Sequence, residues 1–371
     1  MSAPTPPAPA TTRNAFIDHL RVVLTVLVIL HHTAIAYGGS GGWYWRQEPN
    51  ASNRLLLLFN ATNQSFFMGF FFLLAGYYTP ASFDRKGAGR FLGDRFTRLG
   101  LPLLGYFLIL SPMTIALARM GSGHAFWSGW WLMLREGQCE PGPLWFAEAL
   151  LLFALVYAAW RRWVAPVQPS WPDFPSHRAL LWAALGVGVA NIAVRFLMPV
   201  GQNIAGLQLG YFPAYVLLFA AGCAAARGQM LERVTLAQTR PWAILSLVMF
   251  VLMPVVIIFN GASGHFESGW HTNAIFYAFW DPLIGWGIML TMLWGFRSHL
   301  AGGNVVTAFL ARNAYGAYIV HPPVVVGLGL LLRGWAIPPL LKFGVVGLAA
   351  CAGAWAVAGL LVRVPGLKRI L

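Results

Sequence analysis

Ten mostly apolar stretches of about twenty residues divide this chain, and they constrain its fold more than any other feature. A helix that crosses the hydrocarbon core of a bilayer, roughly 30 Å thick, needs about this many apolar residues. The sequence therefore predicts an all-α fold, a polytopic integral membrane bundle of about ten transmembrane helices. The expected spans are residues 17–38, 55–79, 99–118, 143–160, 179–199, 208–226, 241–260, 274–296, 313–332 and 337–362.

The overall composition supports a membrane protein and excludes three other classes. Hydrophobic residues make up 58% of the chain and charged residues only 10%, with a mean hydropathy of +0.63. Soluble globular proteins carry roughly 25% charged residues, so a soluble enzyme, a disordered chain and a coiled coil are all excluded. Residues 1–13 are rich in Pro, Ala and Thr, and we expect a disordered cytoplasmic tail there. Residues 14–371 are expected to form a single transmembrane domain.

The charge of the chain, +14 with a pI of about 10.3, gives the expected orientation. Such a charge in a soluble protein suggests nucleic acid, but in a membrane protein it first indicates cytoplasmic loops. A cytoplasmic N-terminus places 18 of the 25 Lys and Arg residues on the cytoplasmic side. We therefore expect a multi-pass protein of the bacterial inner membrane, with both termini cytoplasmic and membrane lipids, not nucleic acid, around it.

Span 17–38 carries an arginine and a histidine on one helix face. Arg21 and His32 are eleven positions apart, which corresponds to about 16 Å of helix rise and nearly the same direction, whereas His31 points elsewhere. An anionic ligand anchored at Arg21 can present its reactive end to His32. The alternative is a topology-setting arginine and a histidine that bonds another helix.

The densest cationic cluster precedes the third span. Arg95 and Arg98 are three positions apart, so they are neighbours on a helix surface. Guanidinium groups in this arrangement suit a phosphate-rich ligand. Contact with lipid headgroups is the alternative interpretation.

Two carboxylates lie well inside the expected spans, where ionisable groups are costly and therefore candidates for function. Glu148 follows Trp145 by three positions, so both lie on one helix face. Asp281 precedes Pro282, which suggests either a partner for another ionisable group or a cap at a helix break.

Span 313–332 combines tyrosines, a histidine and a proline pair. Tyr315, Tyr318 and His321 recur every three residues on one side, and Pro322 and Pro323 follow directly. We expect the prolines to break the helix in mid-membrane, since broken helices are tolerated where they line a cavity. The three cysteines of the chain have no metal-binding spacing, and we predict no metal site.

Taken in order, several of these motifs resemble the membrane-bound acyltransferase-3 family of acyl-CoA-dependent O-acyltransferases. The likeness extends from residue 14 to about residue 325, and its closest branch is the succinyl-transferring, glucan-modifying one. The residues that carry it are Arg21 and His32; Phe71, Phe72, Ala75 and Gly76; Arg95, Arg98 and Pro102; the PLWF segment 143–146; and Tyr318, His321 and Pro322. Ala75 replaces the serine of the family pattern, so a hydroxyl present in relatives is absent here.

The resemblance implies transfer of an acyl group from cytoplasmic acetyl-CoA or succinyl-CoA to a hydroxyl of an extracytoplasmic glycan or glycolipid. Arg21, Arg95 and Arg98 would bind the donor, and His32 would act as general base or as nucleophile. His321 and Glu148 are the further catalytic candidates. The candidates for acceptor binding are Asp281, Trp145 and Tyr318.

Two other functions remain compatible with the polar residues inside the membrane. A proton-coupled transporter or exporter of a glycan or small anion would use Glu148, Asp281 and the histidines. A structural scaffold protein would tolerate apolar replacement of the same residues. The sequence does not define an oligomeric state.

Overall fold

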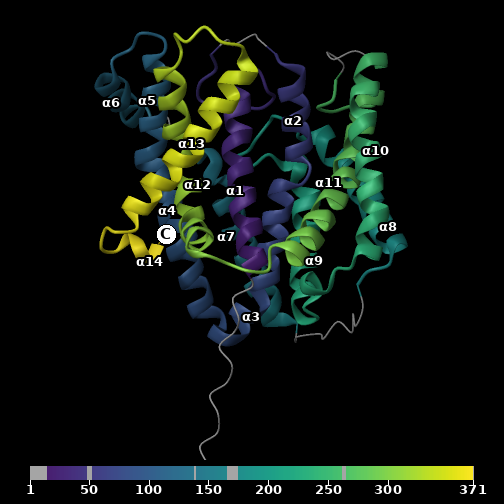
Figure 1. Cartoon of the computed structure of the whole chain (residues 1–371). Helices are drawn as coiled ribbons and strands as arrows, with labels where there is room; N and C mark the ends of the chain where they lie inside the picture. Colours follow the sequence, from purple (N-terminus) through teal and green to yellow (C-terminus); the bar gives the residue numbers. More distant parts are fainter. Residues whose placement is uncertain (1–14, 48–51, 138, 165–173, 261–264, 371) are drawn as a thin grey trace, which may run out of the picture.

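The computed structural model describes residues 15–47, 52–137, 139–164, 174–260 and 265–370, and these form a bundle of helices (Figure 1). The expected tail at residues 1–13 lies outside the described part. Within it the helices are α1 Ala15–Ala36, α2 Arg54–Gln64, α3 Phe67–Arg95, α4 Leu101–Gly105, α5 Ser111–Met120, α6 Phe126–Arg135, α7 Trp145–Trp163, α8 His177–Leu197, α9 Phe212–Arg227, α10 Leu236–Asn260, α11 Thr272–His299, α12 Val305–Leu331, α13 Pro339–Leu361 and α14 Leu367–Ile370.

Short helical turns complete the bundle. Two π-helical turns, η1 Phe96–Gly100 and η2 Tyr106–Leu110, flank α4, and the 3₁₀ turns are η3 Gly142–Leu144, η4 Leu209–Tyr211 and η5 Met230–Arg233. Over the described ranges the structure contains no β-strand, only an isolated bridge between Ile204 and Leu207. The all-α prediction is therefore confirmed.

Nine helical segments of the described chain are long and apolar enough to cross a membrane. One of them, Arg54–Met120, contains both the second and the third expected span. The backbone leaves helical geometry at Gly87, where φ is 72° and ψ is 166°, a conformation that glycine adopts without steric cost. The chain turns back there, so that the part of α3 before Gly87 runs in the opposite direction to α4–α5 (Figure 1).

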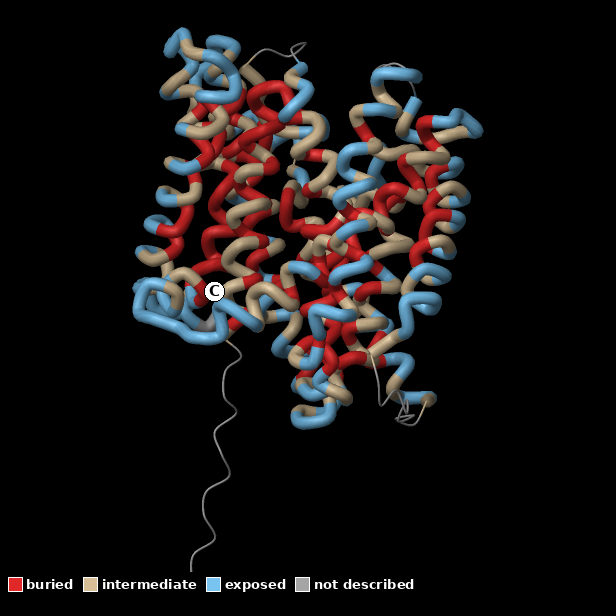
Figure 2. Tube along the Cα trace, turned by 45° about the vertical axis from the view of Figure 1, so that its right-hand side comes forward, coloured by how far each residue is buried: buried red, intermediate tan, exposed pale blue. Residues whose placement is uncertain are grey.

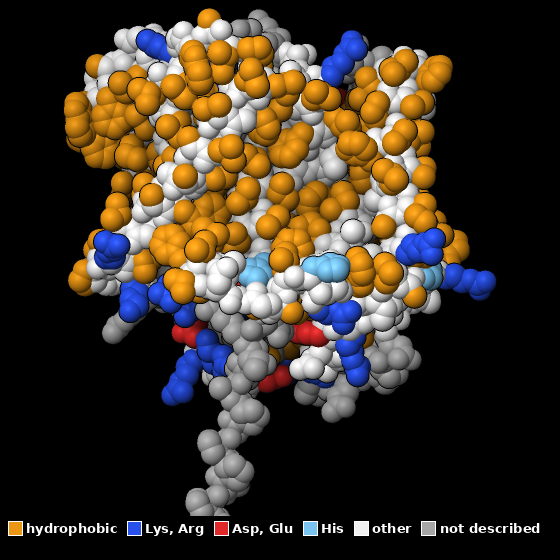
Figure 3. Space-filling model, viewed as in Figure 1, with side chains coloured by type: hydrophobic (Ala, Val, Ile, Leu, Met, Phe, Trp, Pro, Cys, Tyr) orange, Lys and Arg blue, Asp and Glu red, His pale blue; other side chains and the backbone are white. Residues whose placement is uncertain are grey.

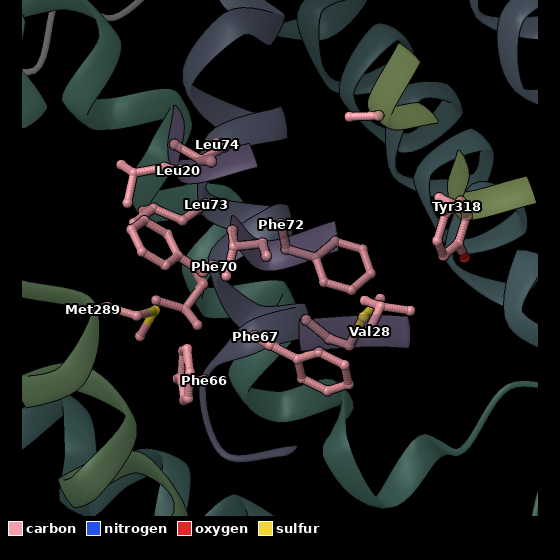
Figure 4. Packing of buried hydrophobic residues seen from close by; sticks show 14 of the residues in the cluster. Leu20, Val28, Phe66, Phe67, Phe70, Phe72, Leu73, Leu74, Met289 and Tyr318 are labelled. Carbon is pink, nitrogen blue, oxygen red and sulfur yellow. The ribbon is translucent and has the colours of Figure 1, made fainter. Parts of the chain in front are cut away.

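Helix α1 lies inside the bundle and contacts α12, α13, α11, α3 and α2. Buried residues run along the inner faces of the helices, and exposed residues lie on the outside and at the ends (Figure 2). In the core between α1 and α3, Val28 packs near Phe67, Phe70 and Phe72 (Figure 4). This packing fixes the position of α1 relative to its neighbours.

The two ends of the bundle differ in charge and in aromatic content. Lys, Arg, Asp and Glu side chains gather at the end where the grey N-terminal trace leaves the molecule (Figure 3). At the opposite end, α6 lies beside the bundle and exposes Trp127 and Trp131 (Figure 1). This short helix provides aromatic side chains suited to a membrane–water interface.

The expected helix breaks at the prolines are not found. α12 continues through Pro322 and Pro323, and α11 continues through Pro282, so Asp281 does not cap a helix end. Proline removes one backbone N–H donor and leaves the carbonyl four residues earlier without its helical partner. The structure supplies other donors to two of the freed carbonyls, those of Ala278 and Tyr318, which helps the helices to stay continuous.

Candidate active site

Two histidines from distant parts of the sequence meet inside the bundle. Nε2 of His321 on α12 lies 3.0 Å from Nδ1 of His32 on α1, and the two rings are nearly parallel with centroids 5.0 Å apart. His19, near the start of α1, contacts the carbonyl of Leu300 just before α12. Both helices therefore begin at the charged end, and each carries its histidine about 25 Å further along.

Pro322 gives His321 a defined hydrogen-bonding partner. Because Pro322 has no N–H, the carbonyl of Tyr318 lacks its usual helical donor, and Nδ1 of His321 contacts this oxygen. A carbonyl oxygen can only accept, so Nδ1 of His321 carries the hydrogen and Nε2 is an acceptor. Nδ1 of His32 then donates to His321, which leaves Nε2 of His32 with a free lone pair.

The loop after α1 places Trp43 over both histidines. The indole ring stacks on His32 with a centroid distance of 4.2 Å and an angle of 17° between the planes. The same indole is parallel to His321 within 12°, at 5.9 Å. Three aromatic rings therefore form one layered group, and its described contacts include no carboxylate.

His31 is held on a different side of α1, as its position on the helix predicted. Its ring stacks on Phe67 at 5.0 Å, and its Nδ1 accepts from the amide of Asn63 at 3.3 Å. The same amide also donates to the carbonyl of Leu27. His31 therefore helps to fix the packing of α1 on α2 and α3, beside the His32 ring.

A row of tyrosines connects the histidine pair with the charged end. Tyr318 lies beside His321, Tyr315 stacks on Tyr318 at 6.3 Å, and the Tyr315 hydroxyl donates to the carbonyl of Arg98 at 2.9 Å. The Tyr318 hydroxyl donates to the carbonyl of Pro143 at the start of α7. One face of α12 thus leads from the arginines to the imidazoles.

The three arginines expected to bind a ligand lie at the charged end and not at the histidines. Arg21 is partly exposed, with Nη1 3.7 Å from the Asp18 carboxylate. Arg95 lies over the ring of Phe91 at 5.1 Å, and Arg98 is exposed. Their guanidinium groups keep donors available for an anion, because a contact with an aromatic ring uses the flat face of the group.

The structure places Asp281 in a second polar cluster. Nη2 of Arg195 on α8 lies 2.6 Å from the Asp281 carboxylate, and both side chains are buried. The guanidinium lies between the rings of Tyr211 and Tyr277, at 5.3 and 4.9 Å. Arg195 also donates to the carbonyl of Gly210. This ion pair joins α8 and α11, away from the stacked rings.

Trp145 and Glu148 begin α7 but have different surroundings. Trp145 stacks on Tyr215 at 5.8 Å and approaches Phe72 of α3. Glu148 is partly buried and, within the described residues, has no hydrogen bond or ion pair to either imidazole. Of the predicted site residues, the geometry therefore brings together His32, His321 and Tyr318.

Trp43 is the residue that sequence reasoning missed. It lies in the segment GGWYW, residues 41–45, between two expected spans. Two glycines before an aromatic cluster could have indicated a loop that folds back onto the bundle, since glycine permits tight turns. Nothing in that pattern identifies the histidines beneath it.

No group of three or more His, Cys, Asp and Glu side chains that could hold a metal ion occurs within the described ranges. A helical bundle in which a row of tyrosines connects an imidazole pair with a cationic end is suited to group or proton transfer.

Comparison with known proteins identifies the family. The profile of a family described as an acyltransferase domain matches residues 14–359, nearly the whole chain. The chain belongs to this acyltransferase-3 family and is a multi-pass membrane acyltransferase. The transporter alternative receives no support. No curated protein and no solved structure matches the chain.

Proposed function

We propose that this protein transfers an acetyl or succinyl group from acyl-CoA to a hydroxyl of an extracytoplasmic glycan or glycolipid, as the glucan-modifying branch of the family would. The observation that carries the proposal is the contact between His32 and His321, reached from the cationic end along α12. The charged end then faces the cytoplasm of a bacterium, and both termini lie on that side of its inner membrane. Residues 14–371 act as one domain.

The donor would bind at the charged end. Coenzyme A carries several phosphates, and Arg21, Arg95 and Arg98 offer guanidinium donors of the kind that bind phosphate through paired hydrogen bonds. The tyrosine row on α12 gives a path from Arg98 toward His321. A long, thin pantetheine arm suits such a path, because about 16 Å of helix rise separates Arg21 from His32.

The histidine pair would supply general base catalysis. Nε2 of His32 takes the proton from the acceptor hydroxyl, whose oxygen attacks the thioester carbonyl. His321 stabilises the resulting imidazolium because its Nε2 accepts from Nδ1 of His32. The proton on His32 then passes to the departing sulfur, which leaves as the CoA thiol. Tyr318 fixes His321 through its carbonyl.

The remaining predicted residues would contribute around this centre. Glu148 and Trp145 lie at the start of α7, and Pro143 in the preceding turn η3 accepts from Tyr318. They would contact the acceptor or orient it. Asp281 would contribute to acceptor binding only if its pairing with Arg195 leaves one carboxylate oxygen available, and Oδ1 has no partner among the described atoms.

The direct test measures transfer of labelled acetyl or succinyl groups by the protein in sealed vesicles. The labelled acyl-CoA is supplied on one side and a glucan oligosaccharide on the other. His32→Ala should lower the rate about 10²–10⁴-fold, the usual contribution of a general base. His19→Ala, on the same helix at the charged end, is the matched control and should retain activity. Wild-type rates in His32→Ala, or no transfer from either donor by the wild type, would contradict the proposal.

A further inference from the structure

The indole N–H of Trp43 is a buried hydrogen-bond donor that has no acceptor among the described residues. Nε1 is shielded from solvent and has no partner within the described part of the chain. An unsatisfied buried donor costs roughly 1–3 kcal/mol. The unsatisfied N–H lies next to the histidine pair, because the same indole ring stacks on His32 and is parallel to His321.

The position of this donor relative to His32 is defined by the ring stack. An indole N–H lies in the plane of its ring, and that plane is parallel to the His32 imidazole within 17°, at a centroid distance of 4.2 Å. Nε2 of His32 and Nε1 of Trp43 therefore lie in adjacent parallel layers. The two stacked rings are in contact, so a reacting carbonyl would lie at the edge of the stack, with its attacking hydroxyl near His32 and its oxygen near the indole N–H.

Several contacts fix the loop that carries Trp43. The hydroxyl of Tyr44 lies 2.9 Å from that of Tyr106, and the amide of Asn60 donates to the Ser40 carbonyl at 2.7 Å. Lys342 donates to the side chain of Gln47 at 2.9 Å. Burial raises the pKa of Tyr44 to about 12, so its hydroxyl stays protonated at neutral pH. The loop is thus held on both sides of Trp43.

We propose that Trp43 donates its indole N–H to the thioester carbonyl oxygen and stabilises the negative charge that develops there. This assignment rests on the acyl transfer proposed above. As the hydroxyl oxygen bonds to the carbonyl carbon, the π-electron pair moves to the carbonyl oxygen, which Nε1–H binds. Collapse of the intermediate re-forms the carbonyl and expels the CoA sulfur, which takes the proton from His32. A donor fixed in advance is effective because it needs no reorganisation during the reaction.

The nature of the ligand follows from the donor. An uncharged N–H in a dry, aromatic setting favours a carbonyl oxygen that gains charge only in the transition state, rather than a preformed anion, which would require a counter-charge. Trp43 thus differs in role from the arginines, which are suited to the phosphates of the donor. In this site the arginines would recognise the acyl-CoA donor, whereas Trp43 would stabilise the reacting carbonyl.

The test replaces the N–H while keeping the ring. Trp43→Phe should lower kcat about 10²-fold, as removal of one such donor does, with little change in the KM for acyl-CoA. Substitution by benzothienylalanine, which keeps the ring size and replaces N–H by sulfur, should give the same loss. Release of the CoA thiol in the presence of a glucan oligosaccharide measures the rate. Trp45→Phe, two residues along the same loop, is the matched control and should keep the wild-type kcat.

A second measurement separates this role from simple packing. A CoA thioether, which has no carbonyl, should bind equally well to the wild type and to Trp43→Phe. A kcat within twofold of wild type in both Trp43 variants would overturn the assignment while leaving the proposed acyl transfer intact. An equal loss of thioether binding and of kcat would also overturn it, since Trp43 would then only shape the site. Absence of thiol release by the wild type counts against the acyl transfer itself.

Discussion

The pairs Asp281–Pro282 and His321–Pro322 look alike in sequence but serve different arrangements. In each, a proline inside a long helix leaves a carbonyl without its helical donor, Ala278 on α11 and Tyr318 on α12. Asn191 of α8 donates to the Ala278 carbonyl at 3.1 Å, whereas the Tyr318 carbonyl contacts the imidazole of His321 itself. The first arrangement joins two helices, and the second orients an imidazole.

Charge separates the two regions further. Arg195 and Asp281 carry opposite charges that compensate each other inside the bundle. His32 and His321 bond to each other, and their described contacts include no counter-charge. Loss of either partner of a buried ion pair destabilises the fold, because it leaves an uncompensated charge. An imidazole pair with a free lone pair can accept a proton, so of the two regions only the His32–His321 pair is suited to general base catalysis.

The prediction with the largest expected effect concerns the contribution of the Arg195–Asp281 ion pair to stability. Asp281→Leu should lower the free energy of unfolding by about 3–5 kcal/mol, because Arg195 is left buried without a counter-charge. Chemical or thermal unfolding in detergent measures this change. The double variant Arg195→Met with Asp281→Leu should recover most of the loss. An Asp281→Leu protein of normal stability that no longer transfers acyl groups would instead place Asp281 in acceptor binding.

His321→Gln should show the opposite pattern. We expect kcat to fall about 10²-fold, since His32 loses the partner that stabilises its protonated form. The free energy of unfolding should fall by only about 1 kcal/mol, the typical value of one hydrogen bond. Rates per folded protein and unfolding curves are compared with those of His177→Gln, a histidine that bonds Trp242 outside the site. Normal kcat with lowered stability would make His321 a structural residue.

The sequence predicts the fold well and the site only in part, for a physical reason. Apolar runs specify which segments cross the membrane, and helical periodicity specifies which residues share one face of one helix. Neither specifies which faces of different helices meet. His32 and His321 were therefore both selected as ionisable residues in spans, but their contact across 289 positions was not predicted.

Other differences between the sequence-based expectations and the structure have the same origin. Arg195 lies within the expected span 179–199, yet its pairing with Asp281 depends on how α8 packs on α11. Trp43 lies in a loop, where no helical periodicity indicates which way the side chain points. The predicted breaks at proline were wrong because a freed carbonyl can be satisfied from the side, by Asn191 in one helix and by His321 in the other. Propensity rules describe an isolated helix, whereas the bundle supplies additional donors.

The smallest expected effect comes from the prolines themselves. Pro322→Ala restores an N–H that competes with His321 for the Tyr318 carbonyl, so the imidazole is held less firmly. We expect kcat to fall about fivefold, equivalent to a hydrogen bond of about 1 kcal/mol, with unchanged KM. Pro323→Ala is the matched control, because it restores a donor to the Ile319 carbonyl, which the histidine does not use. Pro282→Ala should leave kcat unchanged and affect only stability, since Asn191 and not a reactive group uses that carbonyl. Equal kcat losses in all three variants would show that helix geometry, rather than the orientation of His321, accounts for the role of proline.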